Sequence, residues 1–114
     1  MNKNLKLKTS KEYADTLNHG KKLTGKGLVI YFKQSEQLKV GIIASKKVDK
    51  LAVGRNKIKR TVREIFRLNK PFVVGDYVII AKSSILKMSY RDIKEDYENI
   101  LNRIDQKNVK TNYN

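Results

Sequence analysis

The chain has 114 residues, with 26 Lys and Arg against 11 Asp and Glu, so its formal net charge is +15. A single domain of this length and charge favours binding to a polyanion over ordinary protein-side catalysis. Cysteine is absent, His19 is the only histidine and no run of about 18 apolar residues occurs, which argues against disulfides, thiolate or histidine metal sites, and membrane-spanning helices.

The first predicted element is a short helix that follows Thr9. Thr9 and Glu12 have the spacing of a capping box, in which Thr9 is the N-cap. Gly20 is placed to end the helix, so we interpret His19 as a residue of its last turn.

Strands are predicted after this helix. Residues 28–32 are β-branched and aromatic and predict one strand, and residues 38–45 predict another. The short connection over residues 33–37 predicts that these two strands pair as a hairpin. Residues 22–24 predict a short additional strand at the sheet edge.

The second half of the chain predicts helix, strand and helix. Residues 55–69 form an amphipathic pattern that ends before Pro71, since the residue before proline avoids the α region. Residues 77–82 predict a strand. Ser89 then opens a final amphipathic helix with Asp92 at its N3 position, and residues 107–114 are expected to be frayed.

The order of these elements predicts one α+β domain over residues 1–114, a two-layer sandwich of helices packed on a small sheet.

Charge is concentrated in one part of the chain. Residues 46–70 contain ten basic and two acidic residues, whereas residues 89–106 contain three basic and five acidic ones. This asymmetry favours a binding face over a uniformly solvated surface. The carboxylates of the last helix, Glu95, Asp96 and Glu98, have no nucleophile or metal partner in the sequence pattern, so we expect them on a solvated face.

The helix predicted at 55–69 concentrates this charge on one side. At about 100° per residue, an arc of about 100° beside the apolar stripe contains Asn56, Lys59, Arg60, Arg63, Arg67 and Lys70, with Arg55 at one edge. Guanidinium groups match phosphate oxygens bidentately, so arginines at helical spacing can follow successive phosphates. The pattern predicts nucleic-acid binding, and the alternative is a charged but unoccupied surface.

Two tyrosines provide a second signal. Tyr31 faces away from Ile30 and Phe32 on its strand, and Tyr13 lies on the first helix. If both share an open sheet face, they can stack on unpaired bases. From the residues alone we favour the alternative, in which both are ordinary core or half-buried tyrosines.

Residues 55–67, R-N-K-I-K-R-T-V-R-E-I-F-R, resemble the signature of the bacterial ribonuclease P protein subunit. Residues 41–47, 52–53 and 76–82 are similar to the strands and loop of that family, so the resemblance covers nearly the whole chain. It implies a four-stranded mixed sheet with three helices in the order α-β-β-β-α-β-α, with a left-handed strand-helix-strand crossover.

The resemblance also implies a function. The family's protein is the cofactor of a catalytic RNA that removes the 5′ leader of precursor tRNA, and the RNA carries out the chemistry with bound magnesium. The implied partners are this RNA and precursor tRNA, with no membrane and no protein partner required. The lack of cysteine and of an apolar segment after the basic N-terminus fits a cytoplasmic protein.

Site residues follow from the same resemblance. Those expected to dock on the catalytic RNA are Lys46, Lys47, Arg55, Asn56, Lys59, Arg60, Arg63 and Arg67, with Asn56 near a metal-binding spot of the complex. Those expected to line a cleft for the single-stranded leader are Tyr13, Leu17, Val29, Tyr31 and Lys82.

Two departures from the family pattern stand out. The loop before Arg55 is one residue longer, with Gly54 directly before the arginine, and Leu17 stands where an aromatic residue is common. A different class of function, a structural ribosomal protein or a general nucleic-acid-coating protein, needs the same charge. It does not need both an arginine face and an uncharged aromatic cleft. A protein nuclease is disfavoured by the single histidine and the lack of a clustered acidic metal site.

Overall fold

The computed structural model describes residues 6, 7 and 9–113, with side chains described as far as Ile104. In chain order the elements are α1 (Ser10–His19), β1 (Lys21–Thr24), β2 (Leu28–Gln34), β3 (Lys39–Ile43), α2 (Ala52–Leu68), β4 (Gly75–Ala81), the 3₁₀ helix η2 (Ser83–Lys87) and α3 (Tyr90–Tyr113). The predicted α+β fold with three helices on a four-stranded mixed sheet is confirmed, and η2 was not predicted. Among the described residues, no helix combines the length and apolar composition needed to cross a membrane.

The sheet has the strand order β1-β2-β4-β3, in which β2 is antiparallel to both neighbours and β3 is parallel to β4. The predicted hairpin between residues 28–32 and 38–45 is therefore wrong, because β4 lies between these strands. Tyr77, Val78 and Ile79 of β4 are all fully buried, and an apolar strand of this kind is most stable where both of its edges and both of its faces are covered. β3 runs antiparallel to β2, as the predicted hairpin requires. The two strands do not pair, however, because β4 lies between them.

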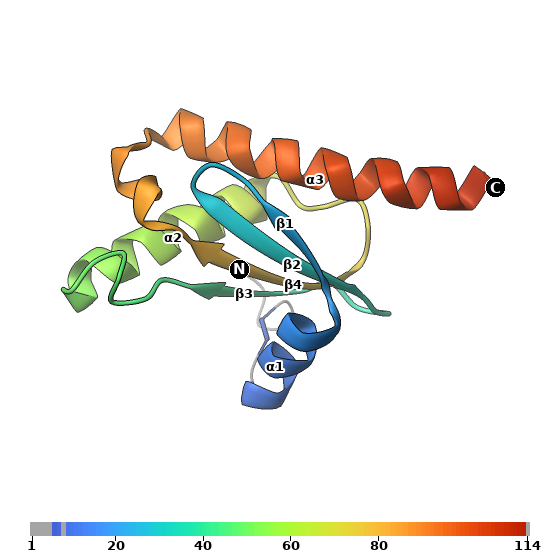
Figure 1. Ribbon diagram of the computed structural model, residues 1–114, viewed down its shortest axis with the longest axis horizontal. Coiled ribbons are helices and arrows are strands. Elements are labelled where there is room, and N and C mark those ends of the chain that lie inside the picture. The colour runs from blue at the N-terminus through green and yellow to red at the C-terminus, as the bar shows by residue number, and fades with distance from the viewer. Residues whose placement is uncertain (1–5, 8, 114) are drawn as a thin grey trace.

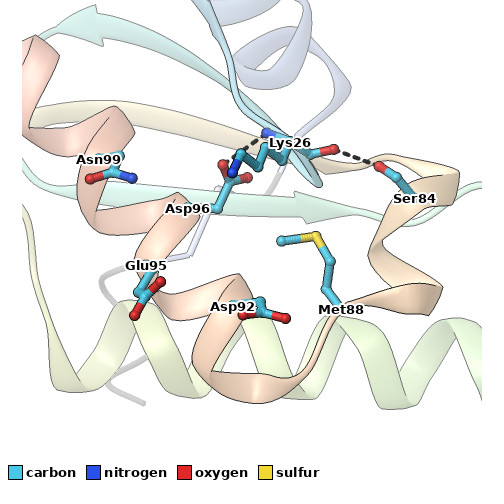
Figure 2. A pocket seen from close by; sticks show the side chains of 7 residues that line it. All are labelled: Lys26, Ser84, Met88, Asp92, Glu95, Asp96 and Asn99. Carbon is cyan, nitrogen blue, oxygen red and sulfur yellow. Dashed lines mark hydrogen bonds between the residues drawn. The ribbon is translucent and has the colours of Figure 1, made fainter.

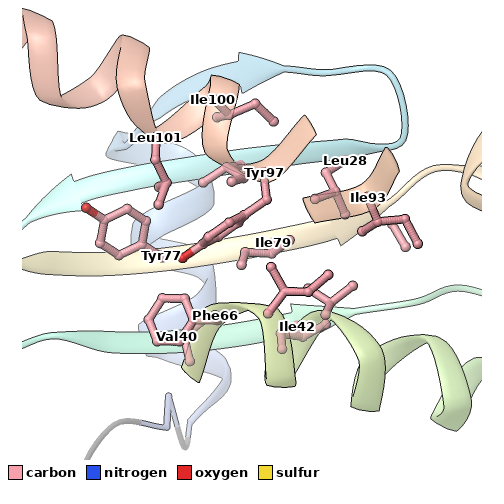
Figure 3. Close-up of a cluster of buried hydrophobic side chains, with 14 of the residues drawn as sticks. Leu28, Val40, Ile42, Phe66, Tyr77, Ile79, Ile93, Tyr97, Ile100 and Leu101 are labelled. Carbon is pink, nitrogen blue, oxygen red and sulfur yellow. The ribbon is translucent and has the colours of Figure 1, made fainter. Parts of the chain in front are cut away.

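Different helices pack on the two faces of the sheet (Figure 1). The face formed by Leu28, Ile30, Tyr77 and Ile79 packs against α2 and α3 and forms the core, while α1 lies across the opposite face. Figure 3 shows Phe66 of α2 in this core. The centroid of its ring lies 6.3 Å from that of Tyr77 and 6.4 Å from that of Tyr97 in α3.

Capping residues fix where two helices begin. In α1 the Glu12 N–H donates to Thr9 Oγ1 at 3.1 Å, and the Thr9 N–H donates to Glu12 Oε1 at 3.1 Å, so the predicted capping box is confirmed. The Asp92 N–H donates to Ser89 Oγ at 3.1 Å in the same arrangement before α3. α3 is helical as far as Tyr113, so it extends into the segment predicted to be frayed.

The turn between β1 and β2 is held by a carboxylate distant in sequence. Asp96 of α3 accepts hydrogen bonds from the backbone N–H groups of Lys26, Gly27 and Leu28, at 2.8, 2.9 and 3.1 Å. Figure 2 shows the first of these bonds, between Lys26 and Asp96. The prediction that Asp96 lies on a solvated face is wrong, since it is only 6% exposed. Its position is three residues after Ile93 and one before Tyr97, both buried, so it points inward from the apolar side of α3.

Three more side chains bind the carbonyl groups of the same turn. Arg103 Nη2 donates to the Thr24 oxygen at 2.9 Å, Lys82 Nζ to the Gly25 oxygen at 3.0 Å, and Ser84 Oγ to the Lys26 oxygen at 2.5 Å. The turn thus has side-chain partners for both its donors and its acceptors, which gives it a single defined position at this end of the sheet.

Candidate RNA-binding surfaces

The basic residues of α2 lie on one side of the helix, next to its buried stripe. We call Asn56, Lys59, Arg60, Arg63 and Arg67 the α2 basic face. Asn56, Arg60 and Arg67 are exposed, and Lys59 and Arg63 are half-buried. The adjacent side of the helix enters the core through its buried residues Val62, Ile65 and Phe66. Amphipathic packing therefore fixes the helix and leaves the basic side available.

No salt bridge neutralises this face within the part of the chain that the structure describes. The salt bridges found there are Lys39–Glu12, at 3.1 Å, and Arg91–Glu95, at 3.6 Å, and neither involves α2. The first turn of α2 also contains no acidic residue. A row of cations without carboxylate partners is an electrostatic site for phosphate groups.

Lys46 and Lys47 lie in a tight turn that leads toward the start of α2. The Val48 N–H donates to the Ser45 oxygen at 3.0 Å, and Ser83 Oγ donates to the Lys47 oxygen at 3.3 Å. Val48 is buried, whereas both lysines are exposed. The turn therefore presents two further positive charges from a fixed backbone.

Arg55 differs from the other arginines of the motif because it is bound to the chain itself. Its Nη1 donates to the carbonyl oxygens of Asp49, at 3.0 Å, and Lys50, at 2.9 Å. α2 begins at Ala52, three residues earlier than predicted, so Gly54 belongs to the first turn and packs on the Asp49 carboxylate. Arg55 thus supports the loop before α2, a role that its place in the sequence motif did not indicate.

The second candidate surface is the side of the sheet on which α1 lies. Tyr31, Val78 and Gly41 are register partners across β2, β4 and β3, and the ring of Tyr13 lies directly over Gly41. With strands about 4.8 Å apart, Tyr31 and Gly41 are about 10 Å apart across this row. The structure therefore brings Tyr31 and Tyr13 to one face, and both are half-buried.

The next row of that face carries apolar side chains. Val29 and Ile43 are both register partners of Ile80, and all three are half-buried. We call Val29, Tyr31, Ile43 and Ile80 the open sheet face. Sequence analysis missed Ile43 and Ile80, although the alternation of side chains along their strands carries the signal.

The two remaining predicted leader contacts flank this face. Leu17 lies one helical turn after Tyr13 in α1 and is half-buried. Lys82 follows β4, on the same side as Ile80 by alternation, and its Nζ donates to the Gly25 oxygen. Lys82 is therefore positioned by the β1–β2 turn.

Tyr13 also lies close to the α2 basic face. Burial raises the pKa of its hydroxyl above the ordinary value, the positive charge of Arg63 acts in the opposite direction, and the carboxylate of Glu12 adds to the rise. Arg63 of the α2 basic face is therefore close enough to Tyr13, which flanks the open sheet face, for its charge to act on that hydroxyl.

Asn56 does not by itself form a magnesium site. Magnesium prefers several oxygen ligands, often carboxylates, whereas Asn56 offers one neutral carbonyl oxygen beside Lys59 and Arg60. Within the described residues, no group of three His, Cys, Asp or Glu side chains could hold a metal ion. The residues around Asn56 therefore fit a phosphate ligand better than a protein-held dication.

Comparisons with known proteins show which family the chain resembles. The family model described as Ribonuclease P matches residues 1–105. A ribonuclease P protein component from Clostridioides difficile is 37% identical over 106 residues, which are 87% of this chain and 90% of that protein. One from Syntrophomonas wolfei is 34% identical over 107 residues, 90% of this chain and 89% of that protein.

Solved structures have the same fold. The RNase P protein of Staphylococcus aureus has a TM-score of 0.80 at 26% identity, over 90% of this chain and 96% of that one. The RNase P protein of Thermotoga maritima has a TM-score of 0.77 at 28% identity, over 86% and 96%. The match of the family over almost the whole length, with the same fold and with an arginine-rich α2, shows that the chain belongs to the ribonuclease P protein family.

Proposed function

We propose that the chain binds the catalytic RNA of ribonuclease P and the 5′ leader of precursor tRNA, and thereby assists the endonucleolytic removal of that leader. The observation that carries the proposal is the α2 basic face, which has no salt-bridge partner among the described residues. Phosphate contacts of this kind supply most of the affinity for a nucleic acid and make it depend on salt.

In this proposal the catalytic RNA docks on the α2 basic face and on Lys46 and Lys47. Arg55 contributes mainly by holding the loop before α2, since its Nη1 is bound to two carbonyl groups. The RNA subunit carries out the hydrolysis and holds magnesium chiefly through its own oxygen atoms, with Asn56 near one such ion. No protein partner is required, and the complex acts in the cytoplasm.

The leader lies on the open sheet face, flanked by Tyr13, Leu17 and Lys82. Stacking on aromatic rings tolerates different base sequences, because every base has a π face. The apolar floor formed by Val29, Ile43 and Ile80 suits unpaired bases better than phosphates.

Reconstitution with the catalytic RNA tests the proposal. The doubly substituted variant Arg60→Ala/Arg67→Ala removes two exposed cations of the α2 basic face, and Lys87→Ala/Arg91→Ala removes two exposed cations elsewhere. We expect the first variant to weaken binding of the RNA and to reduce its salt slope by about 1.4–1.8, at roughly 0.7–0.9 per phosphate contact. The second variant should leave both quantities close to those of the unsubstituted chain.

The same experiment separates the proposal from the alternative of a general RNA-coating protein. A coating protein would bind an unrelated structured RNA of equal length as tightly as the catalytic RNA. It would also fail to stimulate cleavage of precursor tRNA. Either result, with a folded protein, would contradict the proposed function.

A further inference from the structure

The connection from α2 to β4 exposes apolar side chains to water. Phe72 is 81% exposed, Leu68 is 57% exposed and Val74 is 44% exposed. Between and beside them, Pro71, Val73 and Gly75 are buried, so burial alternates along this segment. The outward side of the segment is therefore apolar, although polar residues would be favoured there by solvation alone.

Buried tyrosines hold the backbone of this segment. The Tyr97 hydroxyl donates to the Asn69 oxygen at 2.8 Å, and the Tyr77 hydroxyl donates to the Val73 oxygen at 2.6 Å. The rings of both tyrosines are fully buried in the core. Phe72 therefore projects from an anchored backbone, and a partner that covers its ring would order little additional chain.

The charges around Phe72 indicate the chemistry of that partner. From Ile65 to Gly75 the chain contains no Asp or Glu, and Arg67 and Lys70, which precede Phe72 in the chain, are exposed. An exposed aromatic ring close in the chain to exposed cations is typical of sites where unpaired bases stack and the adjoining phosphates are neutralised. A protein partner would bring carboxylates to these cations, but it would not need an exposed flat ring at the end of a phosphate-binding row.

We propose that Phe72 is an RNA-contact residue, whose ring stacks on an unpaired base of the catalytic RNA while Arg67 and Lys70 contact the adjoining phosphates. The inference rests on the proposed function and extends it. From Asn56, the first residue of the α2 basic face, to Leu68, where α2 ends, the helix rises by about 18 Å at 1.5 Å per residue, and Phe72 lies beyond that end. The RNA-binding surface then runs the full length of α2 and ends on an aromatic ring.

The test measures the affinity of the full-length protein for the catalytic RNA at several salt concentrations. Phe72→Ala should weaken binding roughly 5- to 150-fold, because one base–aromatic stack is lost. The salt slope should not change, since no charge is removed, and the melting temperature should not fall, since the ring is exposed. Phe72→Tyr should retain most of the affinity. Tyr90→Ala, which truncates a 45% exposed aromatic residue on α3, should bind like the unsubstituted protein.

A fluorescence measurement tests the Phe72 contact without relying on a change in RNA affinity. The chain contains no tryptophan, so Phe72→Trp introduces a single reporter. Catalytic RNA should quench this tryptophan strongly through stacking, whereas Tyr90→Trp should be quenched little.

Three results would overturn the inference. The first is Phe72→Ala binding within twofold of the unsubstituted protein, and the second is equal quenching of the two reporters. The third is an effect of Phe72→Ala on self-association in sedimentation experiments with no effect on RNA affinity, which would assign the patch to a protein contact. If the unsubstituted chain binds catalytic RNA no better than unrelated RNA, the proposed function itself fails. If the unsubstituted chain binds catalytic RNA specifically but Phe72→Ala does not change the affinity, only the proposed Phe72 contact is contradicted.

Discussion

Replacement of Asp96 by alanine should cause a large loss of stability. The carboxylate accepts three backbone hydrogen bonds from the β1–β2 turn, at 2.8–3.1 Å, and the N–H groups of Gly27 and Leu28 are buried. In Asp96→Ala these donors lose their carboxylate acceptor. A buried donor without a partner costs about 1–3 kcal/mol.

The expected loss in the free energy of unfolding depends on which of the three N–H groups water can bind once the carboxylate is removed. The Lys26 N–H is only partly buried and borders an open pocket of about 330 Å³, so water can bind it after truncation. The two buried donors carry most of the penalty, and we expect a loss of about 3–5 kcal/mol in the free energy of unfolding. Domains of this size are stable by about 5–15 kcal/mol, so the variant should be close to unfolding at moderate temperature.

Urea denaturation followed by circular dichroism measures this loss. Asp96→Asn keeps the shape but offers one acceptor oxygen and turns an amide N–H₂ toward donors, so it should also be strongly destabilised. Glu95→Ala and Glu98→Ala change exposed carboxylates on the same helix and should stay within about 0.5 kcal/mol. A loss below about 1 kcal/mol for Asp96→Ala would refute the reasoning that this carboxylate holds the turn.

Three further predictions concern the open sheet face and the net charge. Tyr31→Ala should weaken binding of precursor tRNA to the assembled complex and spare mature tRNA, which has no leader; equal weakening of both would remove Tyr31 from the leader site. Gly41→Ala should lower the urea midpoint, because the new methyl group collides with the Tyr13 ring, and a midpoint equal to that of the unsubstituted protein would contradict that close contact. Sulfate or phosphate should raise the melting temperature at matched ionic strength, because anions that bind the folded form offset the repulsion within a net charge of +15; an unchanged melting temperature would contradict this.

Local signals in the sequence are sufficient to predict most of the helices and strands. The spacing of Thr9 and Glu12, and of Ser89 and Asp92, fixes where α1 and α3 begin, because a capping box involves residues three apart. The apolar stripe of α2 likewise predicted which of its sides is buried. These features depend on neighbours within one helical turn, so the sequence contains them directly.

Pairings between distant segments were not predicted. Nothing near residues 28–45 indicates that β4 lies between β2 and β3, since that partner is more than 30 residues away. Asp96 looked like one carboxylate among several, and its partners are about 70 residues earlier in the chain. Arg55 matched the motif as a phosphate ligand, but its hydrogen bonds to Asp49 and Lys50 depend on a loop whose path periodicity does not describe.

The position of β3 explains how one small domain can serve two RNA surfaces. β3 is at the edge of the sheet, with α2 packed near it on the core side and the Tyr13 ring on its Gly41 from the other side. Gly41 lets α1 approach closely, and this brings the Tyr13 hydroxyl within the influence of Arg63. In the proposed function, the catalytic RNA on α2 and the leader on the open sheet face would therefore meet across a single strand. In this proposal Arg63, whose charge acts on Tyr13, would reduce the repulsion between phosphates of the two RNAs where these approach each other.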